Sequence, residues 1–265
     1  MTRPKPSGLG PEYAAQFRDR SIIDAYRFRP PYPDEVFELL AGLVTGEPGA
    51  IPDVGCGAGD LARRLAGEAW VDCVDAVNPS SGMIARGREL PGGTHPRLTW
   101  ITGTAEEAPL RPPYTLITAG SSLHWFDWDV AWPRLDSMLT PDGWLAIVGE
   151  TDRRKPWTAD LGSIITRFST NRDYAPYNLV EELVARGLFS PAGQRQTAAV
   201  PFEQSIDDYV ESFHSRNGLS QQRMGSERAA AFDAEVRALL YGWCPSARVE
   251  LSIVGQVIWG RLGSG

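Results

Sequence analysis

Cysteine and histidine are scarce in this chain of 265 residues, which contains three of each. The cysteines, Cys56, Cys73 and Cys244, are too few and too far apart to build a disulfide framework. No set of histidine, cysteine and acidic residues has the spacing of metal ligands. We therefore expect a protein without a bound metal.

Excess positive charge and long apolar runs are also missing. Acidic residues outnumber basic ones by 33 to 26, a net charge of −7, which argues against a nucleic-acid partner. No apolar run approaches the ~18 residues of a membrane span. Residues 1–11 are rich in proline and glycine and lack the apolar core of a signal peptide. We expect a disordered lead-in over residues 1–11, no membrane partner, a cytoplasmic location, and a monomer or homodimer.

Three glycines at alternate positions are the most informative feature that is present. Gly55, Gly57 and Gly59 follow the strand-like segment 50–54 and precede a helix-like segment, 61–66. Without a Cβ, the backbone of such a turn can approach a ligand closely. A strand, a glycine turn and a helix N-terminus together are typical of a site that cradles a nucleoside.

The hydrophobic pattern predicts the fold class. Hydrophobic residues make up 42% of the chain, enough for a sizeable core. Strands alternate with helices up to residue 150, which is the pattern of a parallel, doubly wound sheet. We predict a Rossmann-like α/β fold with a mostly parallel, seven-stranded sheet and a helical insertion or lid. The predicted strands are 50–54, 70–77, 98–101, 116–119, 144–148, 194–202 and 249–259, and the residues 141–143 are predicted to form a turn.

No flexible linker separates an independent second domain, so we predict a single domain over residues 12–265. Its four parts are N-terminal helices over the site (12–45), the cofactor-binding core (46–150), a helical insertion (151–178), and the rest of the sheet with a lid (179–265).

The glycine spacing discriminates between nucleoside cofactors. Nicotinamide and flavin sites favour G-x-G-x-x-G, whereas here the third glycine comes one position early. Asp53 lies two residues before the first glycine, where a carboxylate suits a ligand that brings an amine and lacks a pyrophosphate. S-adenosylmethionine meets both conditions, and a nicotinamide-dependent enzyme is the less favoured alternative.

Four segments carry a family resemblance. Residues 53–59 (DVGCGAG) resemble motif I of the class I S-adenosylmethionine-dependent methyltransferases, and residues 78–83 (NPSSGM) resemble the element that ends their second strand. Residues 103–110 (GTAEEAPL) are similar to their adenine loop, and residues 135–145 to the segment that leads into their fifth strand. The resemblance implies a class I fold, S-adenosylmethionine as cofactor and S-adenosylhomocysteine as product.

The resemblance also implies a set of cofactor-binding residues, with two departures from the family pattern. Asn78 stands where the family has an acid that binds the ribose, and Thr104 stands where it often has an aspartate that binds the adenine. Both substitutions are expected to weaken the hydrogen bonds to the cofactor. The cofactor-binding residues implied are Arg29, Asp53, Gly55, Cys56, Gly57, Asn78, Pro79, Met83, Thr104, Ala105, Glu106 and Ser121.

A second informative stretch follows the fourth predicted strand. Residues 124–128 (HWFDW) resemble a subgroup of small-molecule methyltransferases that includes trans-aconitate, cantharidin-type acid and juvenile hormone acid carboxyl methyltransferases. His124 is our candidate for the residue that deprotonates or orients the acceptor, and the alternative is that it holds the loop through backbone hydrogen bonds. Trp125, Tyr26 and His214 are candidates for substrate binding, each with a packing role as the alternative.

Two functions are carried forward. The favoured one is methyl transfer from S-adenosylmethionine to a small organic acceptor, with O-methylation of a carboxylate ahead of other sites. The alternative is a methyltransferase fold that binds S-adenosylmethionine but catalyses a cyclisation or isomerisation, or lacks transferase activity. The departures at Asn78 and Thr104 keep this alternative open.

Overall fold

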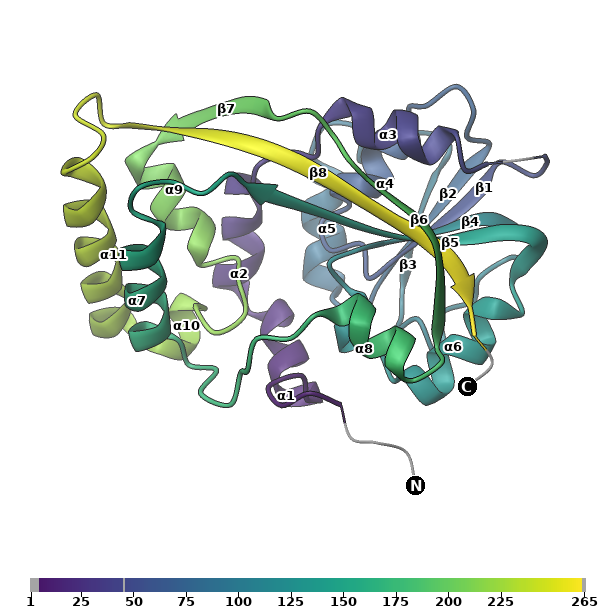
Figure 1. The fold of residues 1–265 in the computed structure, drawn as a ribbon, viewed down its shortest axis with the longest axis horizontal. Helices are drawn as coiled ribbons and strands as arrows, with labels where there is room; N and C mark the ends of the chain where they lie inside the picture. Colours follow the sequence, from purple (N-terminus) through teal and green to yellow (C-terminus); the bar gives the residue numbers. More distant parts are fainter. Residues whose placement is uncertain (1–4, 45, 264–265) are drawn as a thin grey trace. The chain divides into compact units, whose positions relative to one another are not determined.

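The computed structural model describes residues 5–44 and 46–263, and these residues form two compact units (Figure 1). The first unit contains the chain up to Pro31 together with residues 152–176 and 199–253. The second contains residues 32–151 and 177–198 and the chain from Val254 onward. Residues 1–4 of the predicted lead-in lie outside the described residues, and the prediction of a single domain stays a prediction.

An eight-stranded sheet runs through the described residues in the order β3-β2-β1-β4-β5-β8-β6, with β7 paired to β8. Strands β1 to β5 are parallel where their pairing is given, and β6 and β7 are antiparallel to β8. The predicted Rossmann-like, mostly parallel α/β fold is confirmed. The strands are β1 (Ala50–Val54), β2 (Cys73–Asn78), β3 (Leu98–Thr102), β4 (Tyr114–Gly120), β5 (Leu139–Asp152), β6 (Phe189–Gln196), β7 (Val200–Ser205) and β8 (Arg248–Leu262).

The pairing of the strands bears on two of the predicted segments. The predicted strand 194–202 is wrong, because the chain leaves the ladder at residues 197–199, between β6 and β7. This break makes eight strands where seven were predicted. The predicted turn 141–143 falls within the bounds of β5, but the pairing with β4 passes from Leu139 directly to Trp144 and skips residues 140–143.

The second unit buries both faces of its sheet. Neighbouring strand residues alternate between two hydrophobic clusters: Ile117 belongs to one and Leu116 to the other. Since alternate side chains of a strand point to opposite faces, the clusters lie on opposite sides of the sheet. The helices of this unit are α3 (Asp34–Ala41), α4 (Asp60–Leu65), α5 (Ser81–Glu89), η3 (Leu123–Trp125), α6 (Trp128–Asp136) and α8 (Leu179–Ala185).

The first unit is mainly helical and has its own core. Phe213, Phe232 and Leu251 are buried in one cluster to which α7, α9, α11 and the start of β8 contribute. Within the predicted N-terminal helices over residues 12–45, the chain up to Ala25 forms three short helices, and the extended Asp19 separates the last two. The helices are α1 (Pro11–Ala14), η1 (Ala15–Arg18), α2 (Arg20–Ala25), η2 (Tyr26–Phe28), α7 (Thr158–Phe168), α9 (Ile206–Phe213), α10 (Gln221–Met224) and α11 (Ser226–Tyr241).

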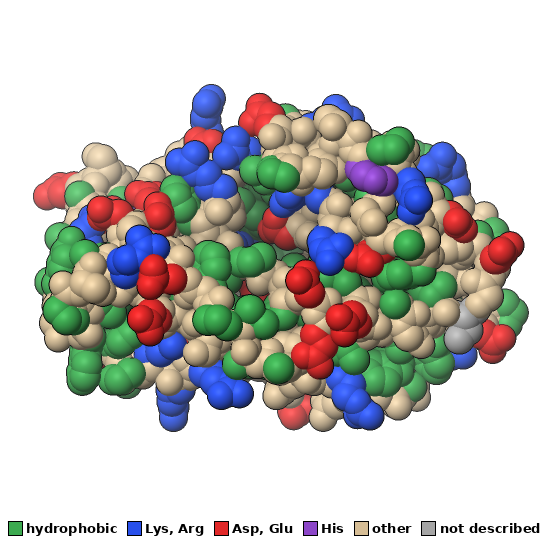
Figure 2. Space-filling model, turned by 90° about the horizontal axis from the view of Figure 1, so that it is seen from above, with side chains coloured by type: hydrophobic (Ala, Val, Ile, Leu, Met, Phe, Trp, Pro, Cys, Tyr) green, Lys and Arg blue, Asp and Glu red, His purple; other side chains and the backbone are tan. Residues whose placement is uncertain are grey.

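The surface carries charges of both signs. On the face drawn in Figure 2, acidic and basic side chains are interspersed with apolar ones rather than gathered by sign. Among the helices that the structure describes, none combines the length and the apolar character needed to cross a membrane.

Candidate functional site

The glycine turn lies at the carboxyl end of β1, as predicted. Gly55, Gly57 and Gly59 have φ values of 72°, 57° and 79°, in the left-handed region that favours glycine. A Cβ on Gly55 would lie 2.4 Å from the Cβ of Ser122, so no side chain fits there. The backbone N–H groups of Gly55 and Cys56 both donate to the carbonyl of Val77, at 2.9 Å, and this fixes the turn against β2.

Trp100 on β3 explains the third glycine of the turn. A Cβ on Gly59 or on Gly87 of α5 would lie 2.4 or 2.3 Å from the same atom of the Trp100 ring, Cη2. The indole N–H donates to the carbonyl of Gly93 at 2.8 Å, which fixes the ring in this position. Sequence analysis missed this contact because the three residues are far apart in the chain.

Asp53 lies beneath the turn and is only 1% exposed. Its carboxylate accepts hydrogen bonds from the Thr118 hydroxyl, at 3.3 Å, and from the backbone N–H of Ala62. Burial raises the pKa of Asp53 from its ordinary 3.8 to about 7, against these two hydrogen bonds, which lower it, and with a contribution from Asp60 that raises it. Asp53 therefore joins β1 to β4 and α4, a support for the turn that the sequence did not reveal.

Cys56 is partly buried, and this burial raises the pKa of its thiol well above the ordinary value. The nearby carboxyl of Asp53 acts in the same direction. Because a thiol with a raised pKa is a poor nucleophile, this residue belongs to the turn as a small, neutral side chain.

Asn78 lies at the end of β2, beside the turn. Its side-chain oxygen accepts from the backbone N–H of Ser80 at 2.8 Å, and its backbone carbonyl accepts from Gly103 at 3.1 Å. The Ser80 hydroxyl in turn caps α5 by accepting from the backbone N–H of Met83. Met83 is fully buried, whereas Pro79 is exposed.

Asp75, the acid nearest to Asn78 along β2, faces away from it. Its carboxylate accepts from the Tyr114 hydroxyl at 2.8 Å and from Arg111 at 2.5 Å. This agrees with the alternation of side chains along a strand. Asp75 therefore cannot replace the acid that is missing at position 78.

The loop after β3 contains the predicted adenine-binding residues. The Thr104 carbonyl accepts from the backbone N–H of Ala108 at 2.9 Å, and Ala105 is buried. The Glu106 carboxylate accepts from the backbone N–H of Asp127 at 2.7 Å, immediately before α6. The loop is thus tied to the segment that follows β4.

The end of β4 has unusual backbone geometry. Ser121 has a φ of 50°, rare for a residue with a side chain, and it is exposed. Ser122 donates its hydroxyl to the carbonyl of Val54 at 2.6 Å, which joins the ends of β4 and β1. A Cβ on Gly120 would lie 2.9 Å from the Tyr32 hydroxyl, so Tyr32 also reaches this edge. Strained backbone of this kind clusters at functional sites.

His124 and Trp125 follow in the single turn η3. Their rings make an edge contact with centroids 4.5 Å apart. Both side chains are partly buried, and Trp125 packs against one of the two cores of its unit. The Trp128 indole donates to the carbonyl of Leu123 at 2.7 Å, which fixes the turn from its far side.

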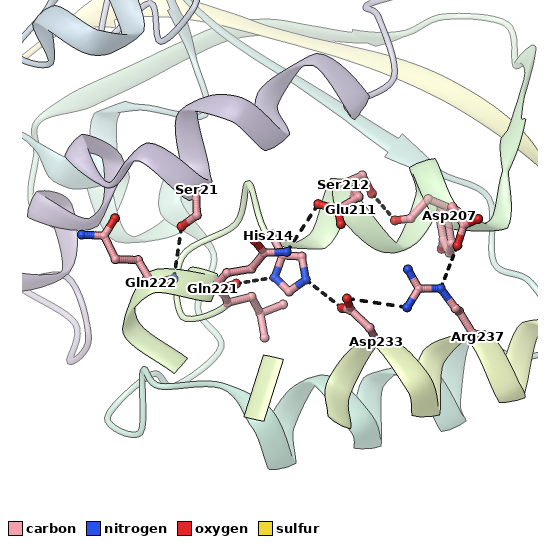
Figure 3. Close-up of polar contacts among 11 residues, drawn as sticks. Ser21, Asp207, Glu211, Ser212, His214, Gln221, Gln222, Asp233 and Arg237 are labelled. Carbon is pink, nitrogen blue, oxygen red and sulfur yellow. Dashed lines mark hydrogen bonds and ion pairs between the residues drawn. The ribbon is translucent and has the colours of Figure 1, made fainter. Parts of the chain in front are cut away.

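The structure brings three further predicted residues, Tyr26, Arg29 and His214, together in the first unit. The Arg29 guanidinium lies over the Tyr26 ring, 4.1 Å from its centroid. It also donates to the hydroxyl of Ser215 at 2.8 Å and to its carbonyl at 2.7 Å. His214 precedes Ser215 and is fully buried, with both ring nitrogens in hydrogen bonds (Figure 3). These contacts favour an internal role for His214 over direct substrate contact.

The second unit brings together the other predicted residues. Parallel strands end at a common edge, and β1, β2 and β4 end at Val54, Asn78 and Gly120. The glycine turn, Asn78, the 104–106 loop and Ser121 follow these ends or that of β3, the place where open α/β sheets bind ligands. Within residues 5–44 and 46–263, no three histidine, cysteine or acidic side chains are grouped as metal ligands.

Comparison with known proteins finds similarity over this core. Residues 51–143 match the methyltransferase domain family. Over 121 residues the chain is 33% identical to trans-aconitate 2-methyltransferase from Variovorax paradoxus (strain S110). This alignment covers 45% of the chain and 45% of that enzyme, so it spans less than half of the relative's length.

Solved structures share the fold at low sequence identity. A candidate type II methyltransferase from Anaeromyxobacter dehalogenans superimposes with a TM-score of 0.60 at 24% identity, over 88% of this chain and 96% of that one. Phosphoethanolamine N-methyltransferase 2 from Haemonchus contortus, solved with phosphomonomethylethanolamine and S-adenosylhomocysteine, gives a TM-score of 0.52 at 15% identity. That superposition covers 94% of this chain and 59% of the other.

Proposed function

We propose that this chain, whose residues 51–143 belong to the methyltransferase domain family, transfers the methyl group of S-adenosylmethionine to a small organic acid. The observation that carries the proposal is the left-handed glycine turn at the carboxyl end of β1. The strand and the helix on either side of the turn belong to the matched segment.

The residues around the turn fit S-adenosylmethionine. By the family resemblance, the turn at Gly55 and Gly57 would hold the methionine end, Asn78 the ribose, and residues 104–106 the adenine. A dinucleotide would instead need a site for its pyrophosphate, for which the G-x-G-x-x-G spacing is absent from this turn. S-adenosylmethionine, when bound, supplies an electrophilic methyl group on a sulfonium.

The proposed acceptor is a carboxylate. The relative from Variovorax is named for methylation of trans-aconitate, an organic acid. A carboxylate oxygen is already an anion, so it attacks the methyl carbon without giving up a proton, and the chain has only to hold it in line at about 3 Å. In this reaction His124 would orient the acceptor, with Trp125 beside it, and would not need to act as a base.

The first test is calorimetric titration with S-adenosylmethionine and S-adenosylhomocysteine, followed by an assay for methyl esters with trans-aconitate and other small carboxylic acids. We expect micromolar binding of both nucleosides and ester formation. Failure of either nucleoside to bind at millimolar concentration would overturn the proposal. Methylation of phenols or amines, without methylation of any carboxylic acid, would overturn the proposal that the acceptor is a carboxylate.

The role of His124 is tested with His124→Gln, with His95→Gln as the matched control. For a carboxylate acceptor we expect His124→Gln to raise KM more than it lowers kcat, because the ring orients the acceptor. A drop in kcat that disappears at high pH would instead indicate a general base and an acceptor that must be deprotonated.

A further inference from the structure

His214 is buried between two groups that can only accept hydrogen bonds. Its Nδ1 lies 2.8 Å from the carbonyl oxygen of Leu219, and its Nε2 lies 2.8 Å from a carboxylate oxygen of Asp233 on α11 (Figure 3). The ring has no exposed surface. Two acceptors require two N–H donors, and only the charged imidazolium has both.

The charged groups around the ring favour the imidazolium. Asp233 comes from α11, where Arg237 approaches its other oxygen at 3.6 Å, and Glu211 comes from α9. Arg216, in the loop after α9, lies over the Phe213 ring instead. Burial alone lowers the pKa of His214, but the hydrogen bonds to Asp233 and Leu219 and the charges of Asp233 and Glu211 outweigh it, so the pKa is raised.

Residues 214–220 form a loop that begins at His214, and the side chain of Arg29 is hydrogen-bonded to this loop. Ser215 is fully buried and accepts two hydrogen bonds from the Arg29 guanidinium, as described above. At the other end of the loop, the Ser220 hydroxyl donates to Asp19 at 2.9 Å, just before α2. The position of the guanidinium therefore depends on the conformation of this loop.

We propose that His214 is a proton-dependent positioning residue: as the imidazolium it holds the 214–220 loop closed, and through Ser215 it sets the guanidinium of Arg29. A neutral ring would keep one N–H and leave either the Leu219 carbonyl or the Asp233 carboxylate without its donor in a buried site. The loop loosens when the ring loses its proton. The consequence for cofactor binding rests on the proposed function and on the cofactor-binding role that the family resemblance implies for Arg29.

The protonation state can be read directly, because the chain has three histidines. In protein labelled with ¹⁵N on the imidazoles, and with His95→Gln and His124→Gln for assignment, both nitrogens of His214 should be protonated at pH 6.5. A single protonated nitrogen at that pH would overturn the proposal.

The link to Arg29 is tested by the affinity for S-adenosylmethionine at pH 6.5 and 8.5. Wild type and His95→Gln should lose about tenfold in affinity over this range, the size of one charge-assisted contact. Ser215→Ala and Asp233→Asn should bind weakly at pH 6.5 and lose little more at 8.5. Asp53 also titrates in this range, but its contribution is common to all four proteins. Equal pH dependence in wild type and Ser215→Ala would overturn the link.

The experiments distinguish a wrong proposed function from a wrong role for His214. If wild type does not bind S-adenosylmethionine at either pH, the function falls, and the imidazole spectrum still decides the state of His214. The melting temperature then tests the closed loop: it should fall from pH 6.5 to 8.5 by more in wild type than in Asp233→Asn. No difference between the two would overturn the proposal.

Discussion

Asn78 has one side-chain oxygen, and that oxygen already accepts a hydrogen bond from Ser80. An aspartate at this position would keep that bond and add a second, charged oxygen for the ribose hydroxyls. Since a hydrogen bond to a charged acceptor is stronger by ~1 kcal/mol, Asn78→Asp should bind S-adenosylmethionine about five- to tenfold more tightly. Calorimetric titration measures this directly.

Asn78→Ala is the matched control for this prediction. It removes both the oxygen that accepts from Ser80 and the amide, so binding should weaken. Unchanged affinity in both variants would mean that position 78 does not contact the cofactor.

Asp53 gives a prediction for stability against pH. Its pKa is about 7 in the folded chain, raised chiefly by burial, but 3.8 when the residue is in water. The folded state thus holds a proton that the unfolded state has released, so stability falls as the pH rises from about 4 to about 7. Asp53→Asn, an amide that mimics the protonated acid, should stabilise the protein by about 1 to 4 kcal/mol at pH 8 and little at pH 4.

Urea unfolding at the two pH values tests this prediction. An amide at position 53 can accept from Ala62 and donate to the Thr118 oxygen, while the Thr118 hydroxyl turns toward the Pro52 carbonyl 3.4 Å away. A loss of stability at pH 8 would mean that the carboxylate, rather than the acid, is the form this site prefers.

At the scale of elements, two helical glycines make a matched pair. A Cβ on Gly87 of α5 would lie 2.3 Å from the Trp100 ring and 2.6 Å from the Ala58 carbonyl, whereas a Cβ on Gly162 of α7 would meet nothing within 4 Å. Gly87→Ala should destabilise the protein by about 1 to 3 kcal/mol, as overpacking does. Gly162→Ala should stabilise it by ~1 kcal/mol through helix propensity.

Thermal unfolding of the two variants measures both effects. Opposite signs are expected from the same chemical change. If both variants stabilise the protein, the ring of Trp100 moves aside at little cost, and its contact with α5 does not constrain the helix.

The sequence predicted best the elements whose ends have local signals. The strand 50–54 has the predicted bounds, because it ends at the glycine turn. The strand 194–202 was wrong because pairing with a distant strand, β8, decides where β6 ends and β7 begins. No local pattern records such pairing.

The same distinction holds for the site. Gly55, Gly57 and Gly59 could be predicted, because glycine is the residue type that favours the left-handed conformation they adopt. Trp100, Ser122 and Tyr32 could not, because each meets the site through a partner that is far away in the chain. His214 was predicted as a candidate for substrate binding or packing, and its two acceptors, Leu219 and Asp233, could not be read from the sequence.

At the scale of the whole molecule, strands that come earlier in the sequence depend on the last strand for pairing. β8 lies between β5 and β6 in the sheet order, and Val257 within it is fully buried. A chain that ends at Ile253 should therefore fail to fold its second unit, since β6 loses its partner and β5 becomes an edge. We expect aggregation, or a loss of the near-ultraviolet circular dichroism signal.

A chain shortened only to Gly263 is the control, because β8 ends at Leu262. It should unfold at the temperature of the full chain. Cooperative unfolding of the chain that ends at Ile253, at a temperature close to that of the full protein, would contradict the prediction.

The ring of Trp100 has a consequence for how this sequence can change over generations. One indole fills the space beside both Gly59 and Gly87. A smaller ring would free neither position, because Gly59 has a φ of 79° that strains any side chain and a Cβ on Gly87 would still lie 2.6 Å from the Ala58 carbonyl. Lineages that lose the tryptophan should therefore still keep both glycines.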